Sequence, residues 1–132
     1  MLAAATLRDS DEGKRAALWT FVVIALLTIP TFLTGEPAEH AIEDLPGVEH
    51  SLIEEHEESA LLSLIAIEVL GAAALAGLFL SRRSRSISPP WILSCLLLAI
   101  VVAAMLAWTS HLGGHIRHPE SRADFVVPAG AE

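Results

Sequence analysis

Histidines with ligand-like spacing lie at one edge of the last apolar segment of this 132-residue chain. His111, His115 and His118 recur at i, i+4 and i+7, which is one face of a continuous helix. His56 precedes the second apolar segment, at the same level if the two segments run antiparallel. Neutral imidazoles together with the Glu55 or Glu36 carboxylate could ligate Zn²⁺, Cu²⁺ or iron, and His56 with His118 could ligate a haem b axially. The residue types therefore suit a transition-metal or haem site at this edge.

Other features of the same region argue against such a site. Gly113-Gly114 is expected to break the helix and so destroy the register between His111 and His118. The chain has no HExxH motif and no Glu-x-x-His pair. The competing interpretation is an interfacial cluster of histidines and glutamates that forms hydrogen bonds and partial salt bridges with Arg117.

Glu68 is an ionisable residue deep inside an apolar segment. It lies about 12 Å from the outer boundary of that segment, where a carboxylate costs about 2.5–3.5 kcal/mol. We expect it to face the other helices, with Thr28 and Thr31 at a similar depth. It is either a proton or ion site, or a protonated side chain whose hydrogen bond fixes helix packing.

Three apolar segments must position these residues. Each has about the 20 residues that cross a hydrocarbon core of roughly 30 Å. The sequence predicts an all-α membrane protein in a lipid bilayer, a single domain with three transmembrane helices in an antiparallel bundle. The predicted spans are residues 16–34, 60–81 and 91–111, with an acidic outer connection at 35–59 that contains a short amphipathic helix, and an outer tail at 112–132.

Small residues lie along one side of the second span. Gly71, Ala74 and Gly77 would let another helix backbone approach closely, as membrane helices do when lipid gives no hydrophobic drive for association. We therefore expect this side to pack against a helix of this chain or of a partner subunit.

Charge predicts the orientation and excludes one class of partner. The formal net charge of -8 argues against nucleic acid, because phosphate binding needs a basic face. Lys and Arg concentrate around Lys14 and in the 82–85 loop, whereas only Arg117 and Arg122 flank the last span on the other side. By the positive-inside rule the N-terminus is cytoplasmic, and the acidic connection and C-terminus are periplasmic, in a bacterial inner membrane. The acidic connection could also attract cations or a basic soluble electron carrier.

Two stretches, Thr34–Ala60 and His111–Glu120, resemble a family of small bacterial multi-span membrane proteins with the motifs TGEPAE…LPG…I-E-x-HEE…A and LGG-x-IRHPE. The resemblance covers nearly the whole chain from Lys14 on and implies no particular activity. The family has a further first span with a motif similar to HLLLNHFP, of which Leu2 to Thr6 looks like the inner end; the span either precedes Met1 or is lost here. The motif positions in this sequence are Glu36, Pro37, Glu39, Pro46, Gly47, His56, Glu57, Gly113, Gly114, Arg117 and His118.

Three functions are compatible with these observations. The first is a non-catalytic accessory or structural subunit of a larger bacterial membrane complex, respiratory or photosynthetic, with other membrane-protein subunits as partners. The second is a haem- or metal-binding electron-transfer bundle that uses His56 and His118. The third is a small proton or ion carrier built around Glu68. The sequence has no Gly-rich phosphate loop and no nucleophile elbow, so an enzyme is the least favoured class.

Overall fold

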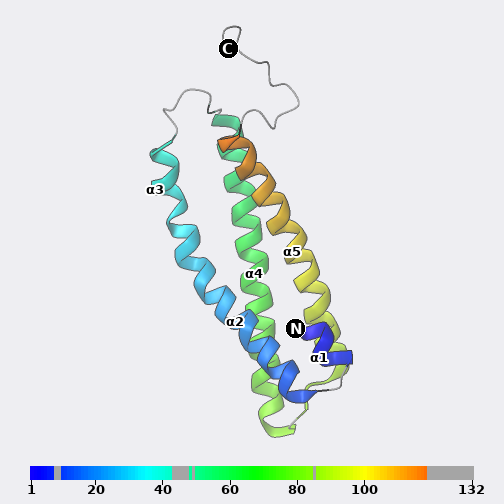
Figure 1. The fold of residues 1–132 in the computed structure, drawn as a ribbon. Helices are drawn as coiled ribbons and strands as arrows, with labels where there is room; N and C mark the ends of the chain where they lie inside the picture. The colour runs from blue at the N-terminus through cyan, green and yellow to red at the C-terminus, as the bar shows by residue number, and fades with distance from the viewer. Residues whose placement is uncertain (8–9, 43–47, 49, 85, 119–132) are drawn as a thin grey trace.

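A computed structural model describes residues 1–7, 10–42, 48, 50–84 and 86–118. Among these residues every regular element is a helix (Figure 1). The helices are α1 (Leu2–Leu7), α2 (Asp11–Leu33), α3 (Gly35–His40), α4 (His50–Ser84) and α5 (Pro89–Arg117). The predicted turn at Pro46-Gly47 and the tail beyond His118 lie outside the described residues.

Three helical segments are long and apolar enough to cross a membrane, which confirms that part of the prediction. They are Asp11–His40, His50–Arg82 and Pro89–Ile116. Each is longer than the predicted span because the helix continues past the apolar stretch. α4, for example, begins at His50, so Glu54, Glu55, Glu57 and Glu58 lie on its first turns.

The start of α2 follows from a capping residue that precedes the apolar stretch. Ser10 is the N-cap, and its hydroxyl accepts a hydrogen bond from the backbone N–H of Gly13 at 3.2 Å. Asp11 and Glu12 in the first turn suit the positive end of the helix. The helix therefore begins five residues before the predicted boundary at residue 16, and it continues through Pro30 to Leu33.

The predicted helix break at Gly113-Gly114 is wrong. α5 runs through both glycines to Arg117, and the N–H of His118 closes its last turn on the carbonyl of Gly114 at 2.9 Å. A glycine in a helix costs about 1 kcal/mol relative to alanine, and packing against α4 offsets this cost. Leu112 is buried, and Gly113 lies against a side chain of α4.

α4 is the central helix, with α2 and α5 packed along it (Figure 1). The chain reverses direction between α2 and α4 and again between α4 and α5. The contact region is fully buried at Leu18 and Ala74. The outward faces carry many exposed leucines, isoleucines and valines, which suits contact with lipid.

Polar contacts fix the end of this arrangement at which α4 ends and α5 begins. Arg15 Nη2 donates to the backbone carbonyl of Ser81 at 2.9 Å, which ties α2 to α4. Trp91 Nε1 donates to the carbonyl of Ala73 at 3.1 Å, which ties α5 to α4. At the other end, α3 and the outer part of α2 diverge from α4 (Figure 1).

Candidate functional site

His56 joins the first turns of α4 to the last turns of α5. Its Nδ1 lies 3.0 Å from the backbone carbonyl oxygen of Thr109. A carbonyl oxygen can only accept, so Nδ1 carries the hydrogen of this bond. In the neutral ring Nε2 is then a hydrogen-bond acceptor and a potential metal ligand. The Nδ1 hydrogen bond to Thr109 holds the ring and so fixes the direction in which Nε2 points.

The close approach of His56 to α5 depends on a glycine. A Cβ atom placed on Gly113 would lie 3.0 Å from Cε1 and 3.3 Å from Nδ1 of the imidazole. The ring edge that makes the Thr109 hydrogen bond therefore rests directly on the backbone of α5. Gly114, one residue later, has open space where a Cβ would stand.

A hydroxyl network extends this contact along the helix pair. Thr109 Oγ1 lies 2.7 Å from Ser59 Oγ and 3.0 Å from Ser63 Oγ. It also lies 3.1 Å from the carbonyl oxygen of Met105, to which it donates. Both serines then donate to the two lone pairs of Thr109 Oγ1, so one threonine links two turns of α4 to α5.

The network was not predicted from the sequence, although a signal for it exists. His56, Ser59 and Ser63 recur at i, i+3 and i+7, which is one helical face. The predicted site used only residue types that ligate metals, so it did not include the two serines or Thr109.

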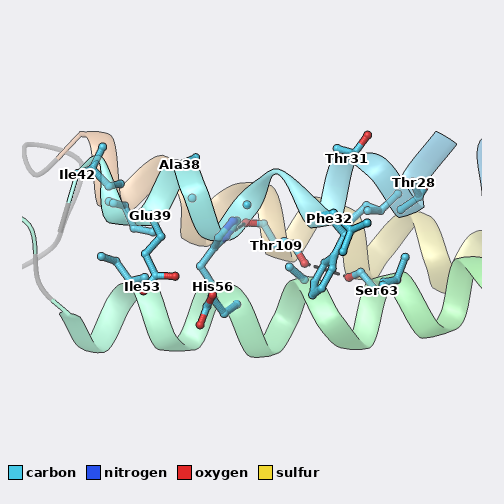
Figure 2. Close-up of a pocket in the computed structure, with 18 of the residues that line it drawn as sticks. Thr28, Thr31, Phe32, Ala38, Glu39, Ile42, Ile53, His56, Ser63 and Thr109 are labelled. Carbon is cyan, nitrogen blue, oxygen red and sulfur yellow. Dashed lines mark hydrogen bonds between the residues drawn. The ribbon is translucent and has the colours of Figure 1, made fainter.

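A cleft of about 1060 Å³ opens beside this network, where α3 and the end of α2 diverge from α4 and α5 (Figure 2). Its wall combines apolar side chains such as Phe32, Leu64 and Ile67 with a polar part at His56 and Thr109. Figure 2 shows Glu39 of α3 on one side of the cleft and the α4 residues Ile53, His56 and Ser63 on the other. The cleft is a mainly apolar space with a small set of polar groups, as binding sites generally are.

The remaining predicted ligands form no metal-binding group of three with His56 in the described part of the structure. His111 and His115 contact each other on α5, with ring centroids 4.2 Å apart. His118 is the C-cap of α5, and the side chain of Glu36 lies outside the described part of the structure. Within that described part, no three histidine, cysteine, aspartate or glutamate side chains lie together as a metal-binding group.

Glu68 lies inside the bundle without the partners expected from its depth. Its Oε1 is buried and has no hydrogen-bond partner. Thr28 and Thr31 donate instead to carbonyls of their own helix, at 2.8 Å and 2.9 Å. The carboxyl group is therefore desolvated at one oxygen with no compensating bond there, which is unfavourable in an apolar setting.

The small residues of α4 lie at its contacts with both neighbours. A Cβ on Gly71 would come within 2.5 Å of Ala25 Cβ on α2, and a Cβ on Gly77 within 2.6 Å of Trp91 Nε1 on α5. Ala74 lies between them and is fully buried. The small residues of α4 thus pack against helices of this chain.

No family model matches the chain, and neither a curated protein nor a solved structure is detectably similar to it. The function is therefore argued from the site.

Proposed function

We propose that this chain is a non-catalytic subunit of a larger bacterial membrane complex, embedded as an antiparallel bundle of three transmembrane helices. The observation that supports this proposal is the cleft between α3, α4 and α5. In a bundle of three helices the outer half of α4 would normally be covered by its neighbours. Here Ala60 and Leu64, which are only half-buried, line a space of about 1060 Å³ instead.

Such a space suits a helix of a partner subunit. Its apolar wall would lose lipid contact and gain close packing, which is the drive for helix association in a bilayer. The His56 Nε2 acceptor would give the incoming helix a polar contact at a fixed depth. The acidic first turns of α4 would steer a basic soluble electron carrier to the same end, which favours an electron-transport complex.

Cross-linking from inside the cleft tests the proposal in native membranes. A benzophenone amino acid at Leu64, which lines the cleft, should form one defined adduct with a subunit that co-purifies stoichiometrically. The matched control is Leu61, three residues earlier and exposed on α4. Ala60→Trp would fill the cleft and abolish both the adduct and the co-purification, whereas Ala72→Trp on the exposed side would leave both intact. Equal cross-linking from Leu61 and Leu64, or an assembly unaffected by Ala60→Trp, would refute it.

We further propose that the N-terminus is cytoplasmic and the acidic end of α4 is periplasmic. Charge bias in the connections supports this orientation. In a Cys95→Ala background, Glu54→Cys should react with a membrane-impermeant maleimide on intact spheroplasts. Glu12→Cys should react only after permeabilisation. The reverse pattern would invert the topology.

A second candidate function is a haem- or metal-binding electron-transfer bundle, and His56 is the observation that favours it. Its Nδ1–H···O=C bond to Thr109 is the usual support of a ligating imidazole, and its ring lines the cleft. A Soret band in the purified protein, lost in His56→Ala, would establish this function in place of the first. His118→Ala would show whether the second predicted ligand takes part.

A further inference from the structure

We propose that His111 and His115 form a two-histidine chelate for one divalent transition-metal ion. The pair lies on α5, and neither residue lines the cleft, whose α5 wall is made by Leu106, Thr109, Gly113 and Ile116. The site is therefore separate from His56 and independent of the proposed subunit function.

The two imidazoles are already in contact. Their ring centroids are 4.2 Å apart with an interplanar angle of 61°. The pair exists because α5 stays helical through Gly113-Gly114, which keeps residues i and i+4 on the same face. Trp108, one turn earlier, lies 5.7 Å from the His111 ring and packs against it.

This geometry is close to that of a bound ion. Two nitrogens that each ligate Zn²⁺ at about 2.0–2.1 Å are separated by roughly 3 to 3.5 Å. The two rings lie 4.2 Å apart at their centroids, so a rotation of the side chains about their χ angles is the change that would turn one nitrogen of each ring toward a shared ion. A pair of histidines at i and i+4 on one helix face also holds the metal in HExxH sites, which shows that the spacing suffices for two ligands.

The ligand chemistry selects the class of ion. Neutral imidazole suits Cu²⁺, Ni²⁺ and Zn²⁺, whereas Ca²⁺ and Mg²⁺ require oxygen ligands. Glu55 and Glu58 of α4 line a shallow groove together with Trp108, whose ring contacts His111, so negative charge lies on the same side of the helix pair. This field attracts cations, and water would complete the coordination sphere.

Metal titration of the full chain tests this assignment. With the purification tag removed and the protein in detergent micelles, Zn²⁺ and Ni²⁺ should each bind one ion per chain by calorimetry. His111→Gln and His115→Gln should each weaken binding by roughly ten-fold or more, about 1.4 kcal/mol at least. His50→Gln removes an exposed histidine from the first residue of α4 and should change nothing.

A spectroscopic readout separates chelation from a structural effect. Cu²⁺ bound to the wild-type chain should show two nitrogen ligands by electron paramagnetic resonance, and one in either single variant. Helix content by circular dichroism should stay the same in all of them. Unchanged binding in His111→Gln would overturn the assignment, as would loss of binding in His56→Gln alone, which would place the metal at the cleft instead.

Discussion

The imidazole of His56 rests on the backbone of Gly113, so close that a methyl group there would stand 3.0 Å from Cε1. The same ring edge donates to the carbonyl of Thr109 at 3.0 Å. The hydrogen bond therefore exists because one residue of α5 lacks a side chain. The adjacent Gly114 makes no such contact.

Gly114→Ala should stabilise the chain more than Gly113→Ala does. Alanine at 114 meets open space and gains about 0.5–1 kcal/mol in helix stability. Alanine at 113 gains the same amount but displaces the His56 ring, and weakening its hydrogen bond costs about 0.5–1.5 kcal/mol. Denaturant unfolding in micelles should show Gly114→Ala as the more stable variant.

A double-mutant cycle separates the two terms at position 113. In a His56→Ala background Gly113→Ala should become stabilising by about 0.5–1 kcal/mol, because only the helix term remains. If the effect of Gly113→Ala is the same with and without His56, the ring does not depend on the glycine.

Thr109→Val should loosen the outer ends of α4 and α5. The change removes the oxygen that accepts from Ser59 and Ser63 and keeps the size of the side chain. Interhelical hydrogen bonds in membranes contribute about 0.6 kcal/mol on average, and up to roughly 1.7, so a loss of about 1 kcal/mol is expected. Thr20→Val is the control, because Thr20 is exposed and bonds only the carbonyl of Ala16. Equal stability of the two valine variants would contradict a role for the network.

Gly71→Ala should push α2 away from α4. The new Cβ would stand 2.5 Å from Ala25 Cβ, and both atoms are fixed by their backbones. Overpacking of this kind costs about 1–3 kcal/mol. Adding Ala25→Gly restores the space, so the double variant should recover much of the lost thermal stability in micelles. Failure of that rescue would place the strain elsewhere.

Glu68→Leu should raise the free energy of unfolding. Removing a buried acceptor that has no partner relieves a desolvation cost of about 1–3 kcal/mol. Destabilisation by a similar amount would show that the carboxyl group has a partner in the membrane.

The proton or ion carrier built around Glu68 has its own test. Proteoliposomes of the wild type and of Glu68→Gln should leak protons and cations equally if the chain is a subunit without transport activity. Flux that disappears in Glu68→Gln would establish the carrier and replace the subunit proposal.

The helices were predictable because their apolar lengths are set by the bilayer, a constraint that each segment satisfies alone. The helix ends were less predictable, because they depend on caps such as Ser10 or on contacts with another helix. Gly113-Gly114 illustrates the second case. Local propensity alone predicts a helix break at a glycine pair. The contact of Gly113 with His56 becomes apparent only when the relative positions of α4 and α5 are known.

The site was predictable in part for the same reason. His56 attracted attention by its residue type, whereas Thr109 became relevant only through its position opposite Ser59 and Ser63. Helix periodicity gives the face of a residue but not its level on the neighbouring helix. The metal and haem hypotheses chose His56 and His118 by residue type, whereas the contacts of His56 with Thr109 and Gly113 are shown only by the structure.

The bond from Arg15 to the Ser81 carbonyl and the close contact of Ala25 with Gly71 hold α2 against α4 as far as Ala25. Beyond Ala25, α2 reaches to Leu33, about 12 Å away at 1.5 Å per residue. A tilt of about 10° around Ala25 would move the end of α2 by roughly 2 Å over such a length. A small rotation of α2 about its tightest contact with α4 would therefore change the width of the cleft beside His56.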